Sequence, residues 1–116
     1  MVEFALVVPV LVLVIFAIIQ MGIVFNNQVT LTDAVRAGAR TAAVSRLQAN
    51  PTAVTVARVR AAAPNLSAAQ LTVGVDSTWV HGDSVTVTAT YPYSVSIAGL
   101  VVKSGTLQSS TVERVE

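Results

Sequence analysis

Residues Phe4 to Phe25 read FALVVPVLVLVIFAIIQMGIVF, and this N-terminal stretch decides how the chain can fold. Only Pro9, Gln20 and Gly22 interrupt 22 residues of otherwise apolar sequence. As a helix the stretch would span about 33 Å, close to the thickness of the hydrocarbon core of a bilayer. A buried strand fits poorly, because strands rarely exceed about ten residues. We therefore expect an apolar helical rod.

Charge divides the chain into two parts. Glu3 is the only charged residue among the first 32, and the next is Asp33. The remaining 84 residues hold 7 basic and 5 acidic side chains. We therefore predict an N-terminal helix over residues 1–48, with residues 1–26 as its membrane or filament-core half. A small α+β domain over residues 49–116 is expected to follow it.

The overall composition excludes several classes of protein. The chain has 116 residues, of which 53% are hydrophobic and 11% charged, whereas soluble domains average about 25% charged residues. Such an apolar chain is not intrinsically disordered. A net charge of +1 argues against electrostatic nucleic-acid binding. There is no cysteine, which excludes disulfides and thiolate metal sites.

The helix is expected to continue beyond the apolar stretch, because no proline interrupts residues 26–48. It would then run from about residue 2 to residue 48, or about 70 Å. Ala34, Gly38 and Ala42 recur every four residues, a spacing that lets another backbone come close. This small-residue stripe packs either on the chain's own C-terminal domain or on neighbouring subunits, and the sequence leaves both open. Helical spacing also defines a wider inward face, formed by Leu31, Val35, Gly38, Ala42 and Ser45.

Two residues near the N-terminus are unusual for an apolar helix. Pro9 lacks an N–H donor and clashes with the carbonyl of Ala5, which predicts a kink or a locally melted turn. Glu3 would be costly to take to the membrane centre, by about 2.5–3.5 kcal/mol. It either reaches water at the membrane surface or pairs with a cation when copies of the rod gather. The α-amine of Met1 in an adjacent copy is one such cation.

The basic residues raise a question of orientation. Arg36, Arg40 and Arg46 follow the apolar stretch, and no base precedes it. The positive-inside rule would then place the C-terminal part in the cytoplasm. That inference fails if a basic leader has been removed before position 1. A secretory signal peptide fits poorly, since it needs a basic region before a shorter apolar stretch.

The sequence after residue 48 predicts one helix followed by strands. Asn50 and Pro51 are a favourable N-cap and first helical residue. A helix from about Thr52 to Ala62 is expected, stopped by Pro64. We expect three residues of this helix to face inward, namely Val54, Ala57 and Ala61.

The residues that follow alternate with a period of two, which is typical of strands. Leu71, Val73 and Val75 alternate with polar residues, and so do the apolar residues of the stretch 85–91. Pro92 is expected to end the second strand and Ile97 to Val102 to form an apolar loop. A third strand is expected over residues 106–115. The predicted fold is therefore α+β, with a three-stranded antiparallel sheet packed on the C-terminal half of the long helix.

Residue patterns typical of catalysis or metal binding are absent from the sequence. The single His81 lies in a turn signal, with Asp76 and Asp83 as its only acidic neighbours. There is no phosphate-binding loop and no nucleophile elbow. We expect no enzymatic activity, no cofactor and no metal. Residues 65–67 match the acceptor pattern for glycosylation, and modification there remains possible.

Residues Val2 to Arg40 resemble the start of a mature TadE-like pilin of the tight-adherence branch of type IV pili. The resemblance is carried by the segment EFAL at residues 3–6, the early Pro9, the patch FNNQ at residues 25–28 and VRAGAR at residues 35–40. The stretch VTVTATYPY at residues 85–93 is also similar to a family strand that ends in Tyr-Pro.

The resemblance implies an extracellular pilus filament on the cell surface, built by polymerisation of the N-terminal helix and used for adhesion. The chain would enter the inner membrane as a prepilin whose basic leader a prepilin peptidase removes, which resolves the question of orientation. A pilus assembly ATPase and a membrane platform would then extrude the filament. Four residues become candidate subunit-assembly residues, namely Met1, Glu3, Phe4 and Pro9.

Two points stay open within this resemblance. The acid of family members usually lies a few residues further from the cleavage site than position 3, so the mature N-terminus is not settled. The chain is either a major or a minor pilin, and the long rod with its small sheet favours the major role slightly. The alternative to a pilin is a single-pass membrane protein whose small extracytoplasmic β domain binds a partner.

Overall fold

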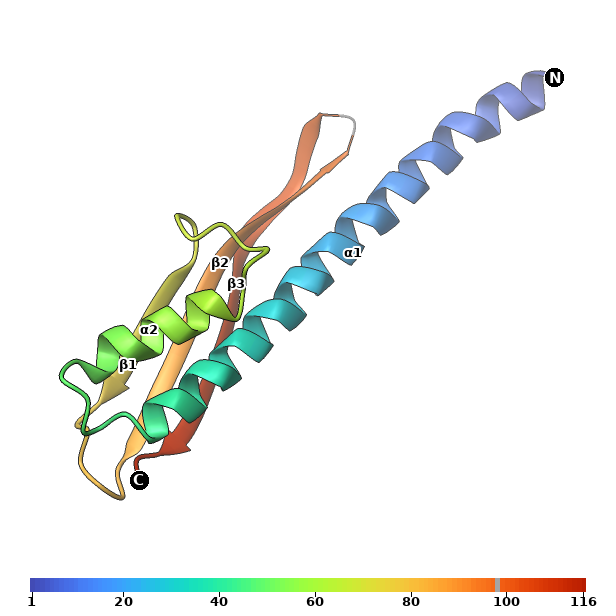
Figure 1. Ribbon diagram of the computed structural model, residues 1–116. Helices are drawn as coiled ribbons and strands as arrows, with labels where there is room; N and C mark the ends of the chain where they lie inside the picture. The colour runs from blue at the N-terminus through green and yellow to red at the C-terminus, as the bar shows by residue number, and fades with distance from the viewer. Residues whose placement is uncertain (98) are drawn as a thin grey trace.

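The computed structural model describes residues 1–97 and 99–116, and it consists of two helices followed by three strands (Figure 1). Helix α1 spans Val2–Ala43 and α2 spans Pro51–Ala61. The strands are β1 (Thr72–Ser77), β2 (Ser84–Ile97) and β3 (Leu100–Arg114), paired antiparallel in the order β1-β2-β3. The predicted α+β class and its three-stranded antiparallel sheet are therefore confirmed.

Helix α1 is half free and half packed. Its first half projects away from the rest of the chain, whereas its second half lies against the sheet and α2 (Figure 1). The residues predicted for the inward face are all buried, from Leu31 to Ser45. Asp33, Arg36 and Arg40 of the same helix are exposed. We call the free part over residues 2–30 the rod, and the packed remainder of the chain the head.

The rod continues through Pro9 without interruption. The α-helix is unbroken from Val2 to Ala43, so the locally melted turn is not present. Figure 1 shows no sharp change of direction near this end, so the expected kink is not a pronounced one. Pro9 lies only about two turns from the helix start. Because proline has no backbone N–H, the helix lacks one hydrogen bond there, the one to the carbonyl of Ala5. The turn before it is intact, with the Ala5 N–H donating to the carbonyl of Met1 at 3.1 Å.

Helix α1 ends at Ala43 rather than at residue 48, so the predicted helix was too long. The reason is a tertiary contact. The carbonyl oxygen of Ala43 accepts a hydrogen bond from the backbone N–H of Glu116, at 2.8 Å, and Arg46 Nε donates to the Glu116 carbonyl at 2.7 Å. The C-terminal segment thus supplies the hydrogen-bond donor for the Ala43 carbonyl, which would otherwise be satisfied by another turn of helix.

Helix α2 begins as predicted. The Asn50 side-chain oxygen accepts a hydrogen bond from the N–H of Ala53 at 3.1 Å, and Pro51 occupies the first turn. The predicted inward face is wrong, however, because Val54, Ala57 and Ala61 are exposed. The buried residues are instead Thr55 and Val59. The hydroxyl of Thr55 is satisfied by donating to the carbonyl of Pro51 at 2.9 Å, which makes its burial tolerable.

Replacing Asn50 by Ala is expected to destabilise the head by about 1 kcal/mol, because the N–H of Ala53 loses its acceptor. Urea unfolding of the full chain in detergent micelles, followed by Trp79 fluorescence, measures this change. Asn50→Ser keeps an acceptor oxygen and is expected to retain most of the stability. Equal stability of Asn50→Ala and the original chain would contradict the capping role.

Strands β2 and β3 are longer than predicted. Strand β2 passes through Pro92 to Ile97, and β3 begins at Leu100. The expected apolar loop is therefore the end of a hairpin, apart from residue 98, which lies outside the described residues. Strand β1 pairs only as far as Thr90 of β2. Beyond that point β2 is an edge strand on one side, where a proline is tolerated. Gly99 adopts φ of +84° beside the turn, a conformation that favours glycine.

The core lies between the helices and one face of the sheet. Val85, Val87 and Ala89 of β2 are fully buried against α1. The residues between them are threonines that remain partly exposed on the opposite face. One of these, Thr88, exchanges a hydrogen bond of 3.1 Å with Ser110 of β3. The sheet therefore has one covered face and one open face, as period-two alternation predicts.

Candidate functional site: the apolar rod and its junction with the head

The predicted assembly residues share the free end of the rod. Met1, Glu3, Phe4 and Pro9 are all exposed, and Phe4 keeps 74% of its accessible surface. Glu3 occupies the first turn of α1, where the free N–H groups of the helix favour a negative charge. No part of the head that the structure describes lies near them (Figure 1). These side chains are thus presented to whatever surrounds the rod.

The rod has the properties of a membrane-spanning segment. Helix α1 contains a window of 18 residues with a mean hydropathy of 3.0, and none of that window is buried within the chain. A core helix of a soluble domain would instead be mostly covered. In the described part of the chain, α1 is the one helix that is long and apolar enough to cross a bilayer. The rod therefore requires lipid or other protein around it.

The small-residue stripe lies inside the head. Ala34, Gly38 and Ala42 are buried within the single chain. A Cβ atom added at Gly38 would lie 2.2 Å from Cγ2 of Val59 and 3.7 Å from the carbonyl oxygen of Thr55. Glycine thus allows α2 to approach α1 closely. Of the two alternatives that the sequence left open, the structure shows packing on the chain's own domain.

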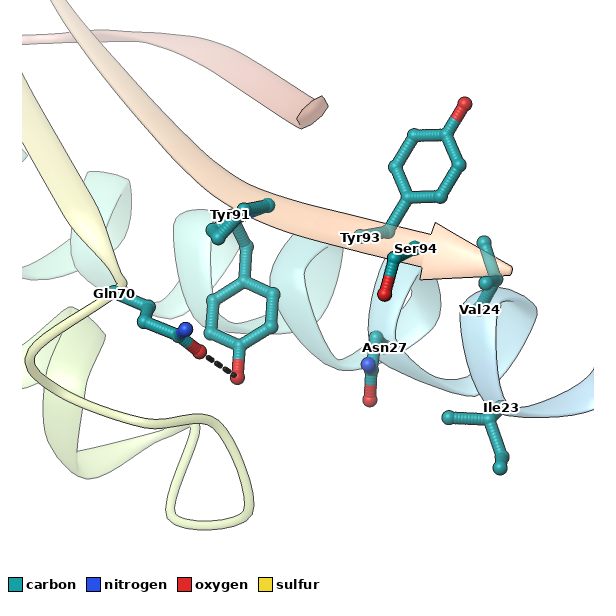
Figure 2. Close-up of a pocket in the computed structure, with 8 residues that line it drawn as sticks. Ile23, Val24, Asn27, Gln70, Tyr91, Tyr93 and Ser94 are labelled. Carbon is teal, nitrogen blue, oxygen red and sulfur yellow. Dashed lines mark hydrogen bonds between the residues drawn. The ribbon is translucent and has the colours of Figure 1, made fainter. Parts of the chain in front are cut away.

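A groove marks the junction between the rod and the head. It encloses about 300 Å³ and lies between α1 and the part of β2 that follows its pairing with β1 (Figure 2). The sequence placed Tyr91 and Pro92 only at the end of the second strand, and the groove was missed. The sequence feature that could have indicated the groove is the Tyr-Pro-Tyr segment at residues 91–93, which lies beside the end of the apolar stretch in the folded chain. The lining residues are Ile23, Val24, Asn27, Gln70, Tyr91, Pro92, Tyr93 and Ser94.

The two tyrosines that line this groove have different partners. The Tyr91 hydroxyl accepts a hydrogen bond from the N–H of Ser67 at 3.2 Å and donates to Oε1 of Gln70 at 3.3 Å (Figure 2). The ring of Tyr93 covers Gly105 on the paired strand, since a Cβ added there would lie 3.0 Å from the ring. Aromatic rings with a polar tip are typical of membrane–water interfaces.

The polar residues of the head do not gather into a metal site. Among residues 1–97 and 99–116, no group of three or more His, Cys, Asp or Glu side chains is placed to hold a metal ion. Asp83 instead accepts a hydrogen bond from the Thr78 hydroxyl at 2.6 Å. The glycosylation acceptor Asn65 is exposed in the connection between α2 and β1, and its modification stays a prediction.

The fold and the rod together define a class of protein: a small α+β head carried on a long, exposed apolar helix that is long and apolar enough to cross a bilayer. Comparison with protein families adds information on the N-terminal segment. The family model of TadE-like proteins matches residues 1–40, which confirms the resemblance over Val2 to Arg40. The chain therefore carries a TadE-like segment at its N-terminus. Comparison with curated proteins and with solved structures produced no significant match.

Proposed function

We propose that this chain is a structural subunit of a type IV-like pilus filament, with the rod in the filament core and the head outside. One observation carries the proposal: an apolar window of 18 residues in α1 has no residue buried within the chain, while the head already has a buried core. Lipid can solvate the rod before assembly, and the rods of other copies can do so afterwards. The TadE-like match at residues 1–40 supports this reading.

Glu3 is the residue to which we assign axial register. In a staggered bundle of rods, the carboxylate of one copy meets the N-terminal amine of the next. Glu3 lies at the exposed end of α1, and no part of the described head covers it (Figure 1). In an apolar environment an unpaired charge is strongly unfavourable, and the pair selects the stagger that satisfies both partners.

The further parts of the proposal follow from the resemblance. The chain enters the inner membrane as a prepilin, and a prepilin peptidase removes a basic leader before assembly. An assembly ATPase and its membrane platform extrude the filament, which serves adhesion on the cell surface. The role is structural rather than catalytic.

The alternative is a single-pass membrane protein that never leaves the bilayer, with a head that binds a partner. Shearing of intact cells separates the two, because a filament subunit is expected in the released fraction while a resident membrane protein stays with the cells. An unrelated inner-membrane protein followed in parallel controls for lysis. Retention of the whole chain with the cells would rule out a filament role.

Mass spectrometry of the same released chain gives its N-terminus. We expect a chain that begins shortly before Glu3 and has lost any basic leader. An N-terminus that retains a basic leader would contradict processing by a prepilin peptidase.

A further inference from the structure

The β2–β3 hairpin extends well beyond the head. Strand β1 stops pairing at Thr90, but β2 and β3 remain paired as far as Ile97 and Leu100. Figure 1 shows this extension projecting along the rod, toward the N-terminal end of α1. Leu100, Val101 and Val102 at its end are 74%, 64% and 64% exposed. Such a cluster of aliphatic side chains at the end of a ribbon requires a partner.

The position of the membrane surface along the molecule can be estimated from the end of the apolar stretch and the residues beside it. The apolar stretch of α1 ends at Phe25, and Ile23 and Val24 line the groove together with Tyr93 and Ser94. When the apolar stretch spans a bilayer, Tyr93 therefore lies close to the membrane–water boundary. Tyrosine is enriched at this boundary, so its position agrees with the level set by the helix.

The hairpin end lies on the membrane side of that boundary. Ile97 is the fourth residue after Tyr93, which places the end at most about 13 Å further along, at about 3.3 Å per residue. Lys103 is exposed directly after the apolar residues. A lysine there can extend its amine to lipid headgroups while its stem stays among apolar groups.

We propose that the end of the hairpin, formed by Leu100, Val101 and Val102, is immersed in the outer part of the bilayer while the rod is membrane-inserted. The occupant of this surface is lipid, and Lys103 favours anionic headgroups. The immersion is shallow, because the free edges of the two strands carry backbone groups that need water or headgroups as partners. The hairpin and α1 would together hold the head at a fixed height and tilt before assembly. This inference depends on the proposed membrane insertion of the rod.

The chain has no cysteine, so a single introduced cysteine can carry a fluorescent label at a chosen position. The test uses the full chain in vesicles of phosphatidylcholine and phosphatidylglycerol, labelled at Val101→Cys with an environment-sensitive dye. We expect a blue-shifted emission, loss of most of the fluorescence with doxyl-labelled lipids, and protection from iodide. Val102→Cys repeats the measurement one residue away.

Two labelled controls separate the possible failures. Val112→Cys lies on the same strand, with a valine 60% exposed, but near the opposite end of the sheet. Its label is expected to remain in water. Leu11→Cys reports on the rod and is expected to be quenched by lipid.

Three results would overturn the inference. If the label at residue 101 behaves like that at residue 112 while residue 11 is in lipid, the immersion of the hairpin is wrong and membrane insertion stands. A label at residue 11 that stays in water would overturn both. Protection of residue 101 from iodide only at high protein-to-lipid ratio, without quenching by doxyl lipids, would identify a second copy of the chain as the occupant.

Discussion

Replacing Glu3 by Gln is expected to remove nearly all surface filaments while the chain remains in the membrane. The substitution keeps the shape of the side chain and removes its charge. In the proposed bundle each N-terminal amine then lacks its carboxylate. Removing one partner of a buried ion pair leaves the other charge unpaired, which is unfavourable by about 3–5 kcal/mol. The penalty recurs at every subunit, so extension of the filament becomes unfavourable. Filaments counted by electron microscopy, with the membrane-bound chain quantified by immunoblotting, measure the effect.

Two substitutions serve as controls for this experiment. Glu3→Asp keeps the charge and is expected to retain part of the filament yield. Asp33→Asn removes an exposed acid from the same helix but within the head, and filament numbers are expected to stay normal. Wild-type numbers of filaments with Glu3→Gln would eliminate the ion pair as the determinant of register.

Replacing Gly38 by Ala is expected to destabilise the head, although alanine favours helices. The new methyl group would lie 2.2 Å from Cγ2 of Val59, which is β-branched and restricted in its rotamers within a helix. Helix α2 must therefore move away from α1. Overpacking of this kind destabilises by about 1–3 kcal/mol, and the helix preference for alanine returns about 0.5–1 kcal/mol. The free energy of unfolding, from urea titration in micelles, is expected to fall by the difference.

Val59→Ala provides the rescue for this prediction. Alone it leaves a cavity at a fully buried position and is also destabilising. Combined with Gly38→Ala, it vacates the space that the new methyl group occupies. The loss of unfolding free energy in the double variant is therefore expected to be smaller than the sum of the two single losses. Additive effects would show that the two positions are not in direct contact. Gly22→Ala in the rod, where nothing lies within 4 Å of the added Cβ, is expected to leave the head unaffected.

The sequence by itself determined the elements whose cause is local. The apolar stretch from Phe4 to Phe25 can be satisfied only as a helix in an apolar environment. Asn50 and Pro51 start α2 because they supply a cap acceptor and a fixed φ. Alternation of apolar residues and threonines assigned the buried face of β2 correctly, since a period of two permits only two faces. The TadE-like segment at residues 1–40 was likewise recognisable from the sequence.

The tertiary structure decided what depends on partners distant in sequence. Helix α1 ends at Ala43 because Glu116 takes the final carbonyl, and no local signal contains that contact. Helix α2 buries Thr55 and Val59 rather than Val54 because it packs with Val59 against Gly38 of α1. Strand β2 continues through Pro92 because β3 pairs with it beyond the end of β1. In each case the local sequence allowed more than one helix end, buried face or strand end. Packing against a segment distant in sequence selected one of them.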